Sequence, residues 1–362
     1  MPEVMQELQE IRTLAREFAQ TELRPHVEHW DHERAIGPDT FAQVAELGFF
    51  GMLIPDDHGG MGFDLPAYAA VLEQLAWGEP GVALTVAYTT LAGQLIQQYG
   101  TEAQRRRWLE PISRGELLPC LAFAEAGSDL RAITTRAVRT GDDWVLSGTK
   151  AWVTNAPNAQ LALVLAETEP GRSLFAVPRE SGWQIGERSH TLGLRVLPIT
   201  ELLLPDVRIT SAETLAVIQP DPSGSLAADL GGLSIAAIAV GLAQAALDHA
   251  VAYAAEREQF GRKLREFEGL QFKLADMATR TEAARALLHR AAVEGESLIA
   301  MAKVFASETA VWVTTNAVQI FGGYGYMRDY PVEKLMRDAK AMELLEGTNE
   351  QLRVRIARAL YR

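Results

Sequence analysis

Apolar residues recur at every third or fourth position through the first part of the chain, which is the period of a helix with one buried face. The pattern comprises Leu8, Ile11, Ala15 and Phe18, and then the runs Phe41–Leu47, Leu65–Ala76 and Val82–Tyr99. Gly48 and Gly100 follow two of these runs, where helix C-terminal caps are expected. Thr101 with Gln104 forms a capping box for one more helix. Residues 1–118 are therefore expected to form a helical N-terminal domain.

The pattern then changes to short runs typical of β-strands, separated by turn residues. These runs are Trp144–Leu146, Ala151–Thr154, Ala162–Leu165, Leu174–Val177 and Glu201–Leu204. Gly141-Asp142-Asp143 stands directly before the first of them and is typical of a hairpin turn. Residues 119–222 are expected to form a small antiparallel β-sheet or barrel as the middle domain.

Helical periodicity returns in the last part of the chain. The long runs are Ser234–Glu258, Leu270–Ala292 and Leu298–Phe321, followed by two shorter ones. Small residues at close spacing let helices approach tightly, which favours a bundle. Residues 223–362 are therefore expected to form a C-terminal four-helix bundle domain, and the whole chain to have an α+β fold.

Composition narrows the possible partners. The 362 residues carry 34 Lys plus Arg against 47 Asp plus Glu, a formal charge of −13 that repels nucleic acids and anionic membranes. The N-terminus lacks the basic and then apolar pattern of a leader, and no uncharged apolar run would span a bilayer. We expect a cytoplasmic protein with neither a nucleic acid nor a membrane as partner. The single cysteine, Cys120, excludes an intrachain disulfide and a Cys-rich metal site.

Three histidines at three-residue spacing imitate a metal site on a helix. They are His26, His29 and His32, and Pro25 with charged neighbours indicates an exposed loop instead. We expect no metal there.

Two stretches in and before the β-region carry candidate chemistry. Ala126-Gly127-Ser128-Asp129 offers backbone and hydroxyl donors to a phosphate or carbonyl oxygen, although alone it is a turn. Gly148–Asn155 is expected to be a strand, on which Trp152 and Thr154 emerge on one face and would suit a planar cofactor. The alternative is an ordinary core tryptophan beside a threonine that bonds to a neighbouring strand.

Two more stretches lie in the C-terminal region. Tyr253–Gly261 ends a long helix with Arg257, which could hold a pyrophosphate or be a solvated helix-end cation. Gln319–Tyr326 is rich in glycine and would bring bare backbone close to a ligand. Further on, Glu346-Gly347-Thr348 is typical of a carboxylate at a turn ahead of the last helix. A glutamate in an apolar cleft would have a raised pKa and act as a base.

These four stretches, in this order and spacing, resemble the acyl-CoA dehydrogenase family over essentially the whole chain. Ile54–Gly62 and Leu270–Met277 also fit the family pattern. The resemblance implies a helical N-terminal domain, a β middle domain and a C-terminal four-helix bundle. It also implies FAD as cofactor without a Gly-x-Gly-x-x-Gly motif.

The resemblance further implies roles for particular residues. Trp152 would cover the flavin ring, Thr154 would bond near its reactive nitrogen, and Ser128 would lie near the flavin and the substrate arm. The residues expected to bind the cofactor are Gly127, Ser128, Trp152, Val153, Thr154, Arg257, Gln259, Phe260, Gln319, Gly323, Thr348 and Glu350. Those expected to bind substrate are Ser128, Glu346 and Gly347. Since Arg257, Gln259, Phe260, Gln319 and Gly323 would reach the FAD of a neighbouring subunit, a homotetramer is expected.

By the same resemblance, Glu346 would take the α proton of an acyl-CoA thioester while the β hydrogen leaves as hydride to the flavin. The product would be the trans-2-enoyl-CoA, and the electrons would pass to an electron-transferring flavoprotein. Homologues of other activity remain as alternatives, namely a flavin monooxygenase-like enzyme or a DNA-associated, repair-type protein. A nitroalkane oxidase-like activity is disfavoured because it would want aspartate as the base.

The chain departs from the family pattern at three places. Phe123-Ala124-Glu125 replaces the usual Thr-Glu-Pro before Ala126, so a threonine that contacts the flavin is absent. Gly231-Gly232-Leu233 stands where an arginine helps to hold coenzyme A, which leaves the thioester carrier open. Glu268 replaces a common glutamine. The acyl-chain limit is expected around Val86–Gln97, and the sequence does not give its length.

Overall fold

The computed structural model describes residues 2–127, 133–169, 171–218, 226–295 and 297–361. The first helices are α1 (Pro2–Phe18), α2 (Val27–Glu33), α3 (Thr40–Glu46), α4 (Leu65–Gly78), α5 (Pro80–Tyr99) and α6 (Glu102–Ser113). Their ends follow the local sequence: Thr101 and Gln104 make the predicted capping box at α6, and Gly48 has the left-handed φ of +74° expected after α3. The helical pattern predicted for this region is confirmed.

The middle of the chain forms the predicted sheet. Its strands are β1 (Pro119–Ala122), β2 (Arg136–Thr140), β3 (Asp143–Thr154), β4 (Leu161–Thr168), β5 (Gly171–Pro178), β6 (Gln184–Arg188), β7 (Ile199–Ile209) and β8 (Thr214–Ile218). They pair in the order β6-β7-β3-β2-β4-β5-β8, with β1 on β4. Gly141 and Asp142 make the tight turn between β2 and β3. The sheet is mainly antiparallel, but β4 pairs in parallel with both β1 and β2.

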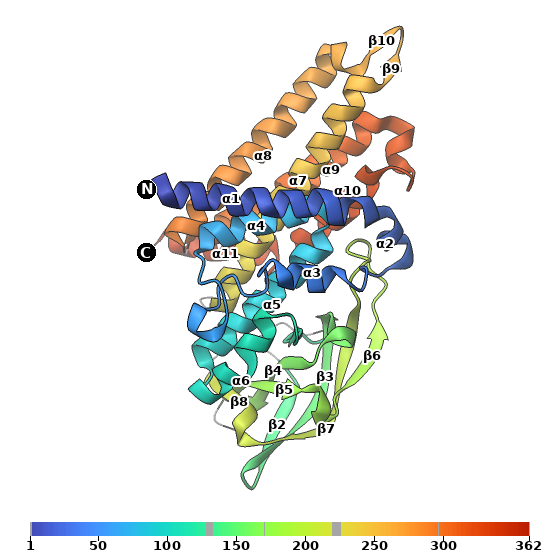
Figure 1. Ribbon diagram of the computed structural model, residues 1–362. Helices are drawn as coiled ribbons and strands as arrows, with labels where there is room; N and C mark the ends of the chain where they lie inside the picture. The colour runs from blue at the N-terminus through green and yellow to red at the C-terminus, as the bar shows by residue number, and fades with distance from the viewer. Residues whose placement is uncertain (1, 128–132, 170, 219–225, 296, 362) are drawn as a thin grey trace.

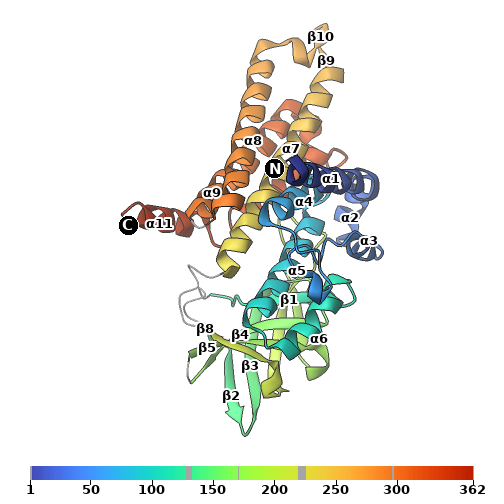
Figure 2. The same ribbon diagram turned by 60° about the vertical axis from the view of Figure 1, so that its left-hand side comes forward.

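The C-terminal region is a helical bundle. Its long helices are α7 (Leu226–Glu256), α8 (Glu268–Glu294) and α9 (Ser297–Phe321), and its shorter ones are α10 (Pro331–Met342) and α11 (Asn349–Ala359). A hairpin of β9 (Glu258–Gln259) and β10 (Arg262–Lys263) joins α7 to α8, and a 3-10 segment, η9 (Gly322–Tyr326), follows α9. Figures 1 and 2 show the sheet at one end of the molecule, this hairpin at the other, and α4 and α5 against the bundle between them.

Helix α7 is the centre of the core. It packs against α4, α5, α8, α9 and α10, and small side chains on it allow these close approaches. Ala236, Ala239, Ala243, Ala246 and Ala250 are all completely buried. Contrary to the expectation from the sequence, α7 and α9 are each long and apolar enough to cross a membrane by length and composition alone. Since 94% of the most apolar window of α7 is buried inside the protein, the core packing accounts for its character.

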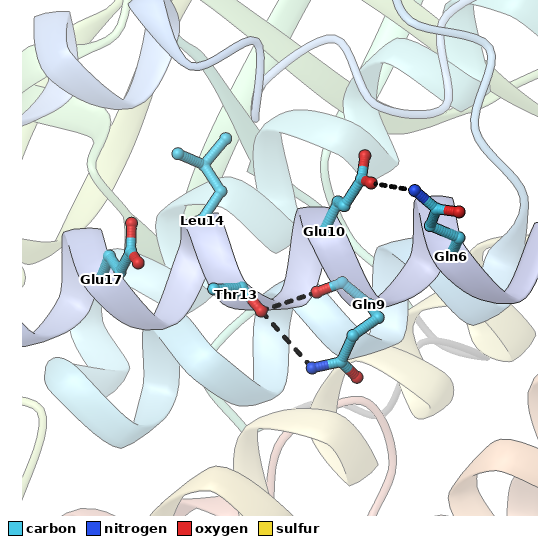
Figure 3. A pocket seen from close by; sticks show the side chains of 6 residues that line it. All are labelled: Gln6, Gln9, Glu10, Thr13, Leu14 and Glu17. Atoms are coloured by element: carbon cyan, nitrogen blue, oxygen red, sulfur yellow. Dashed lines mark hydrogen bonds between the residues drawn. The ribbon is translucent and has the colours of Figure 1, made fainter.

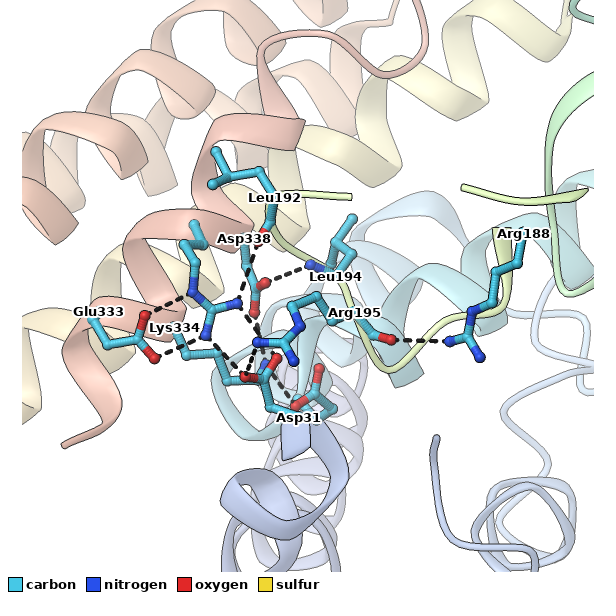
Figure 4. A network of polar contacts seen from close by, with 10 residues as sticks. Asp31, Arg188, Leu192, Leu194, Arg195, Glu333, Lys334 and Asp338 are labelled. Carbon is cyan, nitrogen blue, oxygen red and sulfur yellow. Dashed lines mark hydrogen bonds and ion pairs between the residues drawn. The ribbon is translucent and has the colours of Figure 1, made fainter. Parts of the chain in front are cut away.

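A polar network joins the three regions (Figure 4). Asp31 of α2 pairs with Arg337 of α10 at 2.9 Å and with Arg195 of the loop before β7 at 3.3 Å. In the same place Asp338 accepts the Leu194 backbone N–H at 2.5 Å. Partly buried ion pairs and hydrogen bonds of this kind help to specify the arrangement of the elements they join. Arg195 therefore connects the β-region to the helices.

The segment with three histidines is helical, so the predicted loop is wrong. His26 ends a 3-10 turn, while His29 and His32 lie on α2. The His26 ring stacks on Trp30 with centroids 5.4 Å apart, and this contact helps to order the segment. Within the described ranges, no group of three or more His, Cys, Asp or Glu side chains could hold a metal ion.

Candidate active site

Glu346 lies on the short turn between α10 and α11, as the sequence predicts. Its backbone φ is +53°, and that of Gly347 is +91°. The first value is unusual for a residue with a side chain, because left-handed backbone crowds the Cβ atom. Thr348 then caps α11 through a reciprocal capping box with Gln351. The turn therefore projects a carboxylate from strained backbone just before the last helix.

Three helices surround the Glu346 carboxylate. A Cβ atom built on Gly231 of α7 would lie 2.4 Å from Glu346 Oε2, so the carboxylate rests against bare backbone. The Tyr88 hydroxyl of α5 donates a hydrogen bond to it. Lys303 of α9 acts on it through its positive charge. Both Glu346 and Tyr88 are half-buried, so the carboxylate is enclosed but still reachable.

The enclosure changes the acidity of the carboxyl group. Burial raises the pKa of Glu346 above its ordinary value, while the Tyr88 hydrogen bond and the Lys303 charge oppose that rise. Desolvation disfavours the charged form, so the carboxylate gains proton affinity. Behind it, the buried Tyr68 hydroxyl bonds to Ser234 Oγ at 2.7 Å, one helical turn beyond Gly231. A carboxylate in this state is suited to removing a proton from carbon.

Trp152 lies near the end of β3, where the strand is irregular. The register against β7 shifts between Lys150 and Val153, and Trp152 has a φ of +55°. The regular alternation assumed for Trp152 and Thr154 is therefore interrupted by a β-bulge, which re-aims side chains. The tryptophan remains 57% exposed on an otherwise buried strand end, whereas Val153 and Thr154 are buried. The side chain of Val153 belongs to the sheet core, so only its backbone could reach a ligand.

The segment before Gly127 anchors this strand. Lys150 Nζ bonds to Glu125 Oε1 at 2.7 Å and to the Phe123 carbonyl at 3.1 Å. Both backbone N–H and hydroxyl groups of Thr134 and Thr135 also donate to Glu125. Burial would raise the pKa of Glu125, but the Lys150 and threonine bonds hold it at about 2. The departure from Thr-Glu-Pro thus leaves an ion pair that ties the segment to β3.

The strand end and the Glu346 turn border the same helix. Asn155 Nδ2, directly after β3, donates to Thr85 Oγ1 of α5 at 2.8 Å. Tyr88 stands three residues beyond Thr85, and residues three apart share one helix face. The structure therefore brings the end of β3, at Asn155, and Glu346 to the same face of α5.

The surroundings of Trp152 fit a flat cofactor with polar edge atoms. The exposed indole offers a flat face. Within the described residues, the buried atoms Asn155 Oδ1 and Thr200 Oγ1, next to this strand end, have no hydrogen-bond partner. Gly127 has a φ of +75°, and a Cβ atom added to it would meet nothing within 4 Å, so backbone is open to a ligand there. Ser128, also expected in this place, lies outside the described residues.

The other expected cofactor residues lie far away on the same chain. Arg257, Gln259 and Phe260 are on or beside the β9–β10 hairpin, and Gln319 and Gly323 are at the end of α9 and in η9. The Arg257 guanidinium lies 5.3 Å from the Tyr324 ring centroid, which brings hairpin and η9 together. Since a helix rises about 1.5 Å per residue, the part of α7 from Gly231 to its end spans roughly 38 Å. One chain therefore holds two separate groups of expected cofactor residues.

Thr348 and Glu350 lie close to Glu346 in sequence but have different surroundings. The Thr348 hydroxyl accepts the Gln351 backbone N–H at 3.3 Å as a helix cap. Glu350 is exposed, and bonds to its own backbone N–H and to Thr348 lower its pKa. Both residues have a structural role at the start of α11.

A surface hollow of about 400 Å³ lies away from this site, on the outer face of α1 (Figure 3). It is lined by Gln6, Gln9, Glu10, Thr13, Leu14 and Glu17. All six lining residues come from one helix, and their polar groups bond mainly to one another. The hollow is a feature of an amphipathic helix and contains no candidate base.

The sequence did not single out three residues that contact or face Glu346. Tyr88 falls within the segment Val86–Gln97 expected to limit the acyl chain, but the sequence does not distinguish it from the rest of that segment. Gly231 departs from the arginine pattern of the family, but the sequence does not predict that it contacts Glu346. Lys303 is one lysine in a long helical run, and nothing in the sequence shows that it is completely buried.

Comparison with known proteins agrees with this geometry. The family models for the N-terminal, middle and C-terminal domains of acyl-CoA dehydrogenase match residues 5–116, 120–207 and 227–361. The chain is 38% identical to a probable acyl-CoA dehydrogenase, YngJ, of Bacillus subtilis, over 99% of both chains.

Solved structures are similarly close. A butyryl-CoA dehydrogenase from Megasphaera elsdenii superimposes with a TM-score of 0.93 at 35% identity, covering 98% of each chain. A glutaryl-CoA dehydrogenase from Mycobacterium smegmatis in complex with FADH2 gives a TM-score of 0.94 at 27% identity, covering 98% of this chain and 94% of that one.

The fold, the three matching family models and the similar proteins together show that this is an FAD-dependent oxidoreductase. The chain belongs to the acyl-CoA dehydrogenase family.

Proposed function

We propose that this enzyme oxidises an acyl-CoA thioester between its α and β carbons, giving the trans-2-enoyl-CoA, with Glu346 as the base. The observation that carries the proposal is the half-buried Glu346 carboxylate, enclosed by α5, α7 and α9 and of raised pKa. A base works best when its pKa approaches the operating pH, and burial moves that of a carboxylate in this direction.

The residues of the chain divide the work. Glu346 removes the α proton, and the Tyr88 hydroxyl and Lys303 charge stabilise its ionised form beforehand. The backbone N–H of Glu346 binds the thioester carbonyl oxygen, and such a donor contributes about 3 kcal/mol in the transition state. Trp152 and Thr154 hold the cofactor against the strand end. FAD, when bound, supplies the acceptor for the hydride that leaves the β carbon.

We propose a short acyl chain as the substrate. Two bulky side chains, Tyr88 and the fully buried Tyr68, lie close to Glu346 and support this range. The similarity to a butyryl-CoA dehydrogenase supports the same range. We propose an electron-transferring flavoprotein as the acceptor of the electrons.

A homo-oligomer completes the site in this proposal. The two groups of expected cofactor residues lie at opposite ends of α7, so they serve one FAD only if a second copy supplies Arg257, Gln259 and Phe260. Phe260 is 93% exposed and Tyr326 is 85% exposed, which is unusual for large apolar side chains and supports cover by another copy. A homotetramer is the proposed assembly.

The test is anaerobic titration of the purified flavoprotein with a panel of acyl-CoA esters of different length. We expect flavin absorbance to bleach with short esters. Glu346→Gln should retain FAD and lose this reduction, whereas the surface variant Glu294→Gln should behave as wild type. If the flavin of Glu346→Gln were fully reduced by the ester, Glu346 would not be the base. If no ester reduced the wild type, a homologue of another activity would be the better assignment.

A further inference from the structure

The turn that carries Glu346 needs an external restraint. Left-handed backbone at a residue with a side chain costs of the order of 1 kcal/mol or more. In this turn both Glu346 and Gly347 have positive φ angles. Such conformations persist when surrounding structure holds them. The base can be presented reproducibly only if something fixes the backbone on both sides of it.

Lys303 makes contacts on both sides. Its ammonium group donates to the carbonyl of Glu343 at 3.2 Å, before the base, and to the carbonyl of Gly347 at 2.8 Å, after it. Its third hydrogen bond is to Asn349 Oδ1 at 2.9 Å. An ammonium has three donors, so all of them are used on this turn and on the first residue of α11.

The partners of Lys303 are themselves fixed. The Asn349 side chain donates to Ser307 Oγ at 3.0 Å, one turn beyond Lys303 on α9, and the Asn349 backbone N–H bonds to the Glu343 carbonyl at 3.1 Å. Lys303 and Ser307 are completely buried, and Asn349 is nearly so. The turn is thus held in place by a cluster of buried hydrogen bonds that involves Lys303 and Ser307 of α9.

No carboxylate within the described residues lies within ion-pair distance of Lys303, which sets this lysine apart from Lys150 and Lys334. Burial lowers the pKa of Lys303 to about 8, while the charges of Glu346, Glu343, Glu350 and Glu308 oppose that shift. The buried cation therefore faces the base through space while its bonds go to neutral oxygens. The positive charge of Lys303 therefore acts on Glu346 from a distance, and the Glu346 carboxylate is not held in a direct ion pair.

We propose that Lys303 is a positioning residue, which fixes the strained turn so that Glu346 is presented between α5 and α7, and whose positive charge favours the ionised base. The expected effect on kinetics rests on the proposed function, whereas the role of Lys303 in holding the turn does not depend on that function.

Three variants of the full-length holoenzyme test the proposal. Lys303→Met keeps the length and apolar stem and removes charge and donors. Lys303→Gln removes the charge but retains an amide donor, and it carries the test if Lys303→Met does not fold. Lys340→Met is the matched control, because it removes an exposed cation close to the same turn.

The first readout is hydrogen–deuterium exchange of the backbone of residues 343–349, with the β-sheet as internal reference. We expect faster exchange of this segment in Lys303→Met, a smaller increase in Lys303→Gln and none in Lys340→Met.

The second readout is the pH dependence of flavin reduction. Here kcat should fall by about 100-fold in Lys303→Met, the typical effect of misplacing a catalytic group by about 1 Å. The acid limb should move to higher pH in both Lys303 variants, because the ionised base loses a neighbouring positive charge.

Wild-type exchange in residues 343–349 of a folded Lys303 variant would overturn the proposal, as would an equal effect of Lys340→Met. An unshifted acid limb would overturn the charge effect. If exchange increased as expected while no acyl-CoA ester reduced the wild-type flavin, the positioning role would stand and the proposed function would fail.

Discussion

The substitution Gly231→Ala is expected to displace the Glu346 carboxylate with little effect on the stability of the fold. The added methyl carbon would lie 2.4 Å from Glu346 Oε2 and 2.9 Å from its Cδ and Cγ atoms, whereas ordinary contacts begin at 3.4 Å. The carboxylate must therefore move by about 1 Å, and a displacement of this size typically lowers the rate of catalysis by about 100-fold. At the same time, alanine is favoured over glycine inside a helix by about 1 kcal/mol, which offsets some of the strain.

The expected result is a large loss of kcat with little change in thermal stability or FAD content. Gly232→Ala is the matched control, since it gives the same helix a methyl group that meets only Ile299 Cγ2, at 3.1 Å. Anaerobic flavin reduction by butyryl-CoA would measure the rate, and thermal unfolding the stability. A Gly231→Ala enzyme with wild-type kcat would refute the contact between α7 and the base, and equal losses in both variants would attribute the effect to the helix itself.

Two further predictions concern ionisable groups. In Tyr88→Phe, Glu346 loses a hydrogen bond that favours its charged form, so its pKa should rise and the acid limb of kcat/KM should move to higher pH; an unchanged limb would show that the hydroxyl does not act on the base. In Glu125→Gln, the completely buried Lys150 loses its carboxylate partner, and the free energy of unfolding should fall by roughly 3–5 kcal/mol in urea titrations, with partial recovery in Glu125→Gln/Lys150→Met. Because the pKa of Glu125 is about 2 when folded against an ordinary 4.5, this difference from wild type should be full above pH 4.5 and disappear as the pH falls towards 2. A difference independent of pH would contradict the role of the charged pair.

The sequence by itself determined the elements and their order. Three-to-four periodicity predicted the helices before and after the sheet, because burying one face of a helix leaves a local signature. Turn chemistry was equally local: Gly141-Asp142 and the Thr101–Gln104 box formed where they were predicted. The turn before the last helix was also predicted, since Gly347 and the cap Thr348 mark it. The loop expected around His26 was wrong, because packing against Trp30 orders that segment as helix.

Only the tertiary structure decided what surrounds the base. Tyr88, Gly231 and Lys303 meet at Glu346 from three helices separated by many residues, and such contacts depend on packing rather than on local pattern. The bulge at Trp152 arises from pairing with β7, so strand periodicity did not predict it. The distance between Glu346 and Arg257 follows from the length of α7. The local sequence therefore predicted a carboxylate at this turn, and the family resemblance its proposed role as base, while long-range packing set its position, its pKa and the need for a second copy proposed above.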